Sequence, residues 1–235
     1  MALPGSAPPR VYPARVGLSP SVWFLIAVIA LVAGAAMLLV ERRRAADGSV
    51  RERRRWAAMR GWDYLAVDPV LPSRWRYGTI HMGGPGVARH LISGDVPTPD
   101  GPRQAYAFDH EQGGRATSVL AAVQVQSMLP AAVELRLPSA PVPDDAGLEL
   151  LEPVGERYAF VTSADAIRPL LTSRLIEASD AVGGDVELLW AEDSWVLATV
   201  PLGSSPDRLQ DLLADLAEVA TALEHGLRAN HAPTS

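Results

Sequence analysis

Residues 186–200, VELLWAEDSWVLATV, are the clearest structural signal in the chain. Two runs rich in apolar and β-branched side chains, 186–190 and 195–200, flank the more polar segment 191–194, a pattern typical of a β-hairpin. The two Trp residues end the first run and begin the second, so the pattern predicts that they meet as a cross-strand pair. The sequence therefore predicts an antiparallel hairpin late in the chain.

Two helices are predicted close to this hairpin. Residues 163–180 place several leucines on one side of a helix, with Pro169 near its start or at a kink. Residues 206–228 have Ser205 as N-cap and Pro206 in the first turn, and their apolar residues then recur at helical spacing. Both patterns indicate amphipathic helices that cover a sheet.

The chain before the hairpin is predicted to consist mostly of strands. Short apolar or alternating runs are separated by turns rich in Gly and Pro. The runs are residues 62–67, 77–82, 88–92, 104–108, 118–126, 132–137, 148–151 and 157–161. Strands that pair as successive hairpins, with helices late in the chain, indicate the α+β class. We expect one mostly antiparallel β-sheet domain with two late helices packed on it.

An apolar segment near the N-terminus predicts a membrane anchor. Residues 22–40, VWFLIAVIALVAGAAMLLV, are 19 residues without a charge. As a helix they span about 28 Å, close to the roughly 30 Å hydrocarbon layer of a bilayer. The alternative is a cleaved signal peptide, because residues 33–35, Ala-Gly-Ala, resemble a cleavage site. The long Pro-rich leader and the Arg cluster after the run favour an uncleaved transmembrane helix.

Charge predicts the orientation of this anchor. The chain has a formal net charge of −6, but residues 1–60 carry +7 and residues 61–235 carry −13. Two Arg precede the apolar run, whereas eight follow it within 20 residues. Under the positive-inside rule, the N-terminus lies outside and the C-terminal domain is cytoplasmic. The basic segment surrounds an apolar run, so a membrane is favoured over nucleic acid as its partner. We therefore expect a single-pass protein of the inner (plasma) membrane.

A short Arg-rich helix is predicted after the anchor. Residues 49–52 have the spacing of a capping box, and Gly61 is suited to end the helix. The candidate membrane-surface side chains are Arg42, Arg43, Arg44, Arg51, Arg53, Arg54, Arg55 and Trp56. Binding to anionic inner-leaflet lipid contributes about 1 kcal/mol per basic residue near the surface. The alternative is that these residues only set the topology.

The composition excludes much of enzyme chemistry. All 21 basic residues are Arg, and the chain has no Lys and no Cys. A Schiff-base lysine, a Walker A lysine, a thiolate nucleophile and a cysteine metal site are therefore excluded. The five His residues form no ligand set, and the glycines at 83–86 lack the third Gly of a dinucleotide fingerprint. The sequence predicts no catalytic residues, no cofactor and no metal.

Two motifs place large aromatic rings beside charges. They are Arg74-Trp75-Arg76 and Trp190-x-Glu192-x-x-Trp195. One interpretation is a groove, or partner surface, for a lipid or a partner helix, with these six residues as its lining. The other is core packing with satisfied indole N–H groups.

With these motifs the chain resembles the trehalose monomycolate transport factor A family of mycolic-acid-producing actinobacteria. The resemblance includes Trp23-Phe24, Gly34-Ala35-Ala36, Trp56-Ala57, Gly61-Trp62-Asp63-Tyr64, Arg74-Trp75-Arg76-x-Gly78, Phe108-Asp109, Gly155-x-Arg157, Arg174 and Trp190-x-Glu192-x-x-Trp195 before Pro201. It extends over about 180 residues, from the apolar run to the last helix. The Pro-rich leader and the loops at 83–86 and 138–145 differ from the family pattern, so the chain is either an ortholog or a paralog with another cargo.

This resemblance implies a function and a partner. It implies a non-enzymatic inner-membrane accessory factor for trehalose monomycolate transport, acting with the RND-superfamily mycolate-lipid transporter in mycomembrane biogenesis. The main alternative is a membrane-tethered domain that binds a lipid or ligand of unknown identity. The expected organisation is a leader (1–21), a transmembrane helix (22–40), a juxtamembrane helix (41–61), a cytoplasmic α+β domain (62–228) and a disordered tail (229–235).

Overall fold

The computed structural model describes residues 20–141 and 147–231. Most of the predicted leader and the last residues of the predicted tail therefore lie outside the described residues. The chain divides into two compact units, residues 1–44 and residues 45–235. Within the part that the structure describes, no helix is both long enough and apolar enough to cross a membrane.

Helix α1 runs from Pro20 to Met59. The sequence predicted two helices here, but α1 passes without a break through Gly48 and the predicted capping box, because Ala and Arg, both good helix formers, surround them. Gly61 ends the helix as predicted: its φ is +70°, and the Trp62 N–H donates to the Ala57 carbonyl at 2.9 Å. This bond belongs to a Schellman motif, which fixes the backbone at Trp62.

Nine strands of the described residues form one antiparallel sheet in the order β1-β2-β3-β4-β9-β8-β5-β7-β6. Their bounds are β1 Asp63–Asp68, β2 Val87–Val96, β3 Arg103–Gln112, β4 Arg115–Gln124, β5 Val133–Arg136, β6 Glu149–Val154, β7 Arg157–Val161, β8 Leu188–Glu192 and β9 Trp195–Val200. The predicted hairpin at 186–200 is β8 and β9. It lies in the middle of the sheet, where both faces are covered, which explains its nearly continuous apolar sequence.

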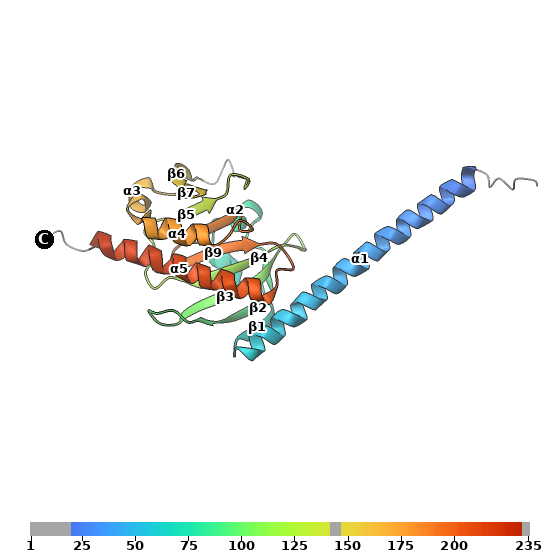
Figure 1. Ribbon diagram of the computed structural model, residues 1–235, viewed down its shortest axis with the longest axis horizontal. Helices are drawn as coiled ribbons and strands as arrows, with labels where there is room; N and C mark the ends of the chain where they lie inside the picture. Colours follow the sequence, from blue (N-terminus) through green and yellow to red (C-terminus); the bar gives the residue numbers. More distant parts are fainter. Residues whose placement is uncertain (1–19, 142–146, 232–235) are drawn as a thin grey trace, which may run out of the picture. The chain divides into compact units, whose positions relative to one another are not determined.

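One face of the sheet is covered by the two late helices, α4 (Ser173–Ala181) and α5 (Pro206–His231), which lie side by side (Figure 1). The predicted helix at 163–180 is divided into α3 (Ala164–Ile167), the 3₁₀ helix η2 (Arg168–Leu170) and α4. Pro169 lies in η2, and the hydroxyl of Thr172 caps α4 by accepting from the Leu175 N–H. The α+β class and the packing of two late helices on the sheet are confirmed.

The other face is covered by residues 71–83, which the sequence assigned partly to a strand at 77–82. They form the 3₁₀ helix η1 (Leu71–Arg74), an extended turn and the short helix α2 (Thr79–Gly83). Alternate residues of the central strands point to each face: Trp190 and Leu197 belong to the smaller core under η1 and α2, whereas Ala191 and Val196 belong to the larger core under α5.

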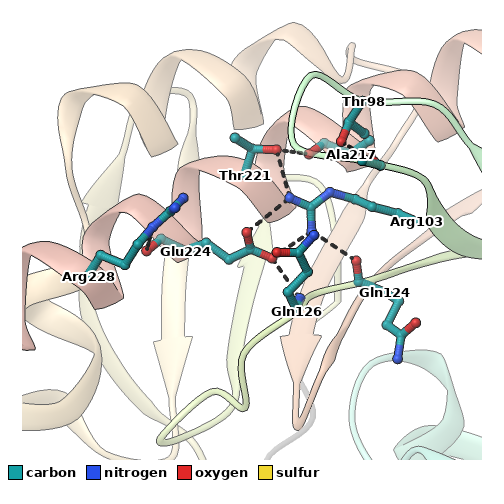
Figure 2. Close-up of polar contacts among 9 residues, drawn as sticks. Thr98, Arg103, Gln124, Gln126, Ala217, Thr221, Glu224 and Arg228 are labelled. Atoms are coloured by element: carbon teal, nitrogen blue, oxygen red, sulfur yellow. Dashed lines mark hydrogen bonds and ion pairs between the residues drawn. The ribbon is translucent and has the colours of Figure 1, made fainter.

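A buried ion pair holds α5 to the sheet (Figure 2). Arg103 of β3 donates two hydrogen bonds to the carboxylate of Glu224, at 2.6 and 3.0 Å, and further bonds to the Thr221 hydroxyl and the Gln124 carbonyl. The Gln126 N–H donates to Glu224 at 2.7 Å. Both charged side chains are almost completely buried, so each depends on the other for its charge compensation.

Candidate functional site

The three Trp residues of the predicted groove lie in the smaller core. Trp75, Trp190 and Trp195 are only 2, 1 and 8 % exposed. The plane of Trp75 is stacked on Phe108, and Trp195 meets the edge of Trp75 with ring centroids 5.8 Å apart. The interpretation of these rings as a groove lining is therefore wrong, because η1 and α2 cover the face of the sheet on which they stand.

The register of the hairpin also differs from the prediction. Asp193 and Ser194 alone form the turn, with Asp193 at φ +50°. This places Trp195 opposite Glu192, and Trp190 opposite Leu197. The predicted Trp190–Trp195 cross-strand pair is wrong, since a two-residue turn moves the second ring closer to the turn than the first.

Glu192 holds the chain that carries Arg74-Trp75-Arg76. Its carboxylate accepts the N–H groups of Arg76 and Tyr77 at 3.0–3.1 Å, and the indole N–H of Trp190 at 3.0 Å. Burial raises the pKa of Glu192, and these hydrogen bonds lower it by a smaller amount. The side chains of Arg74 and Arg76 are exposed. Glu192 therefore joins the two motifs: it binds the backbone after Trp75 and the indole ring of Trp190.

A second buried carboxylate, Glu134 of β5, also binds the backbone of this segment. It accepts the Gly78 N–H at 2.6 Å and the Nε–H of Arg136 at 2.7 Å. Glu134 stands opposite Trp190 in the register of β5 and β8. The sequence reasoning missed Glu134 and Arg136, because alternating charges in a short strand are typical of a solvated face. Their spacing of two residues was the only available signal that both point to one side.

Gly78 explains why the first motif includes a glycine. Its φ is +66°, and a Cβ atom there would lie 2.6 Å from ring carbons of Trp190. A side chain therefore fits neither the backbone conformation nor the space. The two motifs through which the chain resembles a known family are thus one structural unit, a loop fixed on the sheet by two carboxylates and one ring.

The Gly155-x-Arg157 motif is also structural. Arg157 is buried and donates to the carbonyls of Ser179, Gly183 and Val186, around the C-terminal end of α4. Guanidinium groups stabilise such carbonyls because the end of a helix leaves them unpaired. This motif positions α4.

The predicted membrane-surface residues divide into buried and exposed groups. Arg53 is 1 % exposed and forms an ion pair with Asp109 at 2.7 Å, and Trp56 is buried with its ring 5.3 Å from that of Trp62. For Arg53 and Trp56 the membrane-surface prediction is therefore wrong, since one side of this helix packs on the domain. Arg51, Arg54 and Arg55 are exposed. The side chains of Arg42, Arg43 and Arg44 lie outside the described residues.

Two cavities lie near residues of these motifs. The first, of about 390 Å³, is lined by Trp56, Arg60, Trp62, Asp95, Val96, Pro97, Gln210, Leu213 and Ala214. The second, of about 270 Å³, is lined by Arg76, Tyr77, Glu192, Asp193, Thr162 and residues 129–132. Among the described residues, no group of three or more His, Asp or Glu side chains is placed to hold a metal ion.

Comparison with known proteins identifies the family. The model of the trehalose monomycolate transport factor TtfA family matches residues 19–220. Trehalose monomycolate transport factor A of Mycolicibacterium smegmatis is 27 % identical over 186 residues, 78 % of this chain. The chain spans 63 % of the length of that relative.

A solved structure shares the fold. The crystal structure of the mycobacterial trehalose monomycolate transport factor A, TtfA, matches with a TM-score of 0.66 and 24 % identity, over 75 % of this chain and 94 % of that chain. At this identity the structural match shows the fold alone, whereas the family match extends over most of the sequence. This chain therefore belongs to the trehalose monomycolate transport factor TtfA family.

Proposed function

We propose that the chain is a non-enzymatic accessory factor for trehalose monomycolate transport, held at the inner membrane and acting with the RND-superfamily transporter of that lipid. The family match over residues 19–220 carries the proposal. A factor of this kind contributes binding surfaces and needs no catalytic group. The two carboxylate-fixed motifs support such a role, because they make one face of the sheet rigid and leave Arg74 and Arg76 exposed on it.

The cellular test is depletion in the native host. We expect trehalose monomycolate to accumulate inside the cell and trehalose dimycolate to fall, since export precedes the transfer that forms the dimycolate. Re-expression of the chain should restore both. Unchanged amounts of both lipids in depleted cells would refute the proposal.

Membrane attachment and orientation are part of the same proposal. They rest on the charge-free run at residues 22–40, on its exposed apolar side chains such as Phe24, Leu31 and Met37, and on the excess of Arg after it. A fusion of alkaline phosphatase to the C-terminus should be inactive, and a fusion of a cytoplasmic reporter at the same position should be active. The opposite pair of results would overturn the orientation.

The partner is tested by purification of the tagged full-length chain from its own membranes. We expect the transporter to co-purify, and charge reversal of Arg74 and Arg76 to reduce its amount because both side chains are exposed beside a rigid backbone. Charge reversal of Arg168, an exposed residue of η2 on another part of the domain, is the matched control. Equal recovery from both variants would exclude the Arg74–Arg76 surface as the interface.

The alternative, a membrane-tethered domain that binds a lipid or ligand, is favoured by one observation. The 390 Å³ cavity has a size within the range of about 300–1,000 Å³ that small-molecule sites occupy. Native mass spectrometry of the purified chain separates the two functions: a bound glycolipid supports the alternative, and bound transporter supports the accessory factor.

A further inference from the structure

The 390 Å³ cavity is built from three separate parts of the domain. The last turn of α1 contributes Trp56, and the residues that follow it contribute Arg60 and Trp62. The end of β2 contributes Asp95, and α5 contributes Gln210. Two of these residues, Trp56 and Trp62, belong to motifs through which the chain resembles its family.

The indole ring of Trp62 is held rigidly at the cavity. Its backbone is fixed by the Schellman bond to Ala57, and its ring meets the Trp56 ring edge to face at 72°. On another side it lies against the backbone of Gly94, where a Cβ atom would come within 2.3 Å of the ring. A ring fixed in this way loses little entropy when a ligand packs on it.

Two of the polar side chains at the cavity, Arg60 and Gln210, are held in place by contacts within the domain. The Arg60 guanidinium lies over the ring of Trp56, 4.5 Å from its centroid, and donates to the side-chain carbonyl of Gln210. Asp95 is exposed at the cavity and provides a carboxylate.

These walls match the surface of a neutral sugar. A pyranose ring has an apolar C–H face, which packs on an indole, and a rim of hydroxyls, each of which both donates and accepts hydrogen bonds. The carboxylate of Asp95 accepts from hydroxyls, the guanidinium of Arg60 donates to them, and the amide of Gln210 does both. One guanidinium and one carboxylate contribute no net charge, which disfavours an anionic headgroup. An acyl chain would offer no hydrogen bond to the Asp95 carboxylate or to the remaining donors of Arg60 and Gln210.

We propose that this cavity binds a neutral sugar ring, presented either by a glycolipid headgroup or by the free sugar. The proposal rests on the proposed function insofar as the headgroup of trehalose monomycolate is the sugar that the chain meets. Trp62 is the platform under the sugar ring, and Asp95 and Gln210 bind its hydroxyls.

The test measures binding of trehalose and of trehalose monomycolate to the full-length chain in nanodiscs that contain no other glycolipid. Saturation-transfer NMR should report contacts from the C–H protons of the sugar, and tryptophan emission should change when the sugar packs on Trp62. We expect Asp95→Asn and Gln210→Ala each to weaken binding about tenfold, or ~1.4 kcal/mol. Trp62→Leu should abolish the saturation transfer. Asp95 and Gln210 are exposed, so their variants keep the fold, and a thermal melt checks this for Trp62→Leu.

Asp165→Asn is the matched control, because it removes one exposed carboxylate outside the cavity and should leave binding unchanged. Binding of both probes assigns the site to the sugar alone, and binding of the glycolipid only assigns it to a headgroup held at the membrane. No binding of either probe, or equal binding by wild type, Asp95→Asn and Gln210→Ala, would overturn the proposal. If depletion changes the two lipids as expected but the chain binds no sugar, the proposed function is supported and the sugar site is refuted.

Discussion

Replacement of Glu224 by Leu tests whether the buried ion pair holds α5 on the sheet. In the native domain the Glu224 carboxylate accepts two bonds from Arg103 and one from the Gln126 N–H. The variant leaves the guanidinium buried with only the Thr221 hydroxyl and the Gln124 carbonyl as acceptors. Removal of one partner of a buried pair costs about 3–5 kcal/mol. We expect the free energy of unfolding to fall by about 4 kcal/mol, and Tm by roughly 8–16 °C for a domain of this size.

The assay is a double-mutant cycle measured by urea unfolding, followed by circular dichroism. Arg103→Leu alone should cost a similar amount, because it leaves the Glu224 carboxylate buried without its cation. The double variant should lose less than the sum of the single variants by at least about 2 kcal/mol, since neither charge is then left unpaired. A loss below about 1 kcal/mol in Glu224→Leu, or additive losses, would refute the reasoning.

The same pair predicts a pH dependence. Burial alone raises the pKa of Glu224, but hydrogen bonds from Arg103 and the Gln126 N–H outweigh it, so the pKa lies below its ordinary value. The ion pair therefore stabilises the folded state fully above the ordinary Glu pKa of about 4.3. This stabilisation is lost as the pH falls through the lower, folded-state pKa. The difference in stability between wild type and Glu224→Leu should shrink correspondingly in acid.

Three further pairs of substitutions test other contacts. Gly78→Ala should lower the free energy of unfolding by more than about 2 kcal/mol, because the new side chain meets both a positive φ and a clash with Trp190. Gly84→Ala, at φ +79° and in open space, should cost only the backbone strain of about 1–2 kcal/mol. Equal falls in Tm for the two variants would contradict the clash. Glu192→Ala leaves three N–H donors without their acceptor and should lower the free energy of unfolding by about 3 kcal/mol or more. Glu192→Gln keeps an oxygen acceptor and should lower it less. Urea unfolding of both variants measures this difference. Arg53→Met should destabilise the domain by about 2–4 kcal/mol, because it removes the buried guanidinium that pairs with the partly buried Asp109. Arg55→Met, at an exposed position, should change Tm little, and similar melts for the two variants would argue against a structural role for Arg53.

The parts of the fold that were predictable have strong local signals. The hairpin at 186–200 and helix α5 follow from continuous apolar runs and from helical spacing, and both signals act within a few residues. The prediction of a strand at residues 77–82 was wrong for the opposite reason. Its conformation is set by Glu192, 115 residues away from Tyr77, and by Glu134, 56 residues away from Gly78. No local pattern carries that information, so an apolar run was interpreted as a strand.

The site was less predictable than the fold. The Trp motifs were found, but their rings are core, because residues 71–83 cover the face of the sheet on which they stand and no local pattern shows this. The sugar-site candidates Asp95 and Gln210 are ordinary surface residues in the sequence. They become notable only because the sheet and α5 bring them beside Trp62.

The position of β8 and β9 in the middle of the sheet affects how the protein is made. Strands β1–β4 pair with one another in chain order. In the second set β7 pairs with both β5 and β6, and only the late hairpin joins the two sets. On the ribosome, β4 and β5 therefore each present an unpaired edge until residues 186–200 have been synthesised. The second half of β4 is apolar, so this edge favours aggregation during that interval, and the sheet becomes continuous only when the last hairpin has been added.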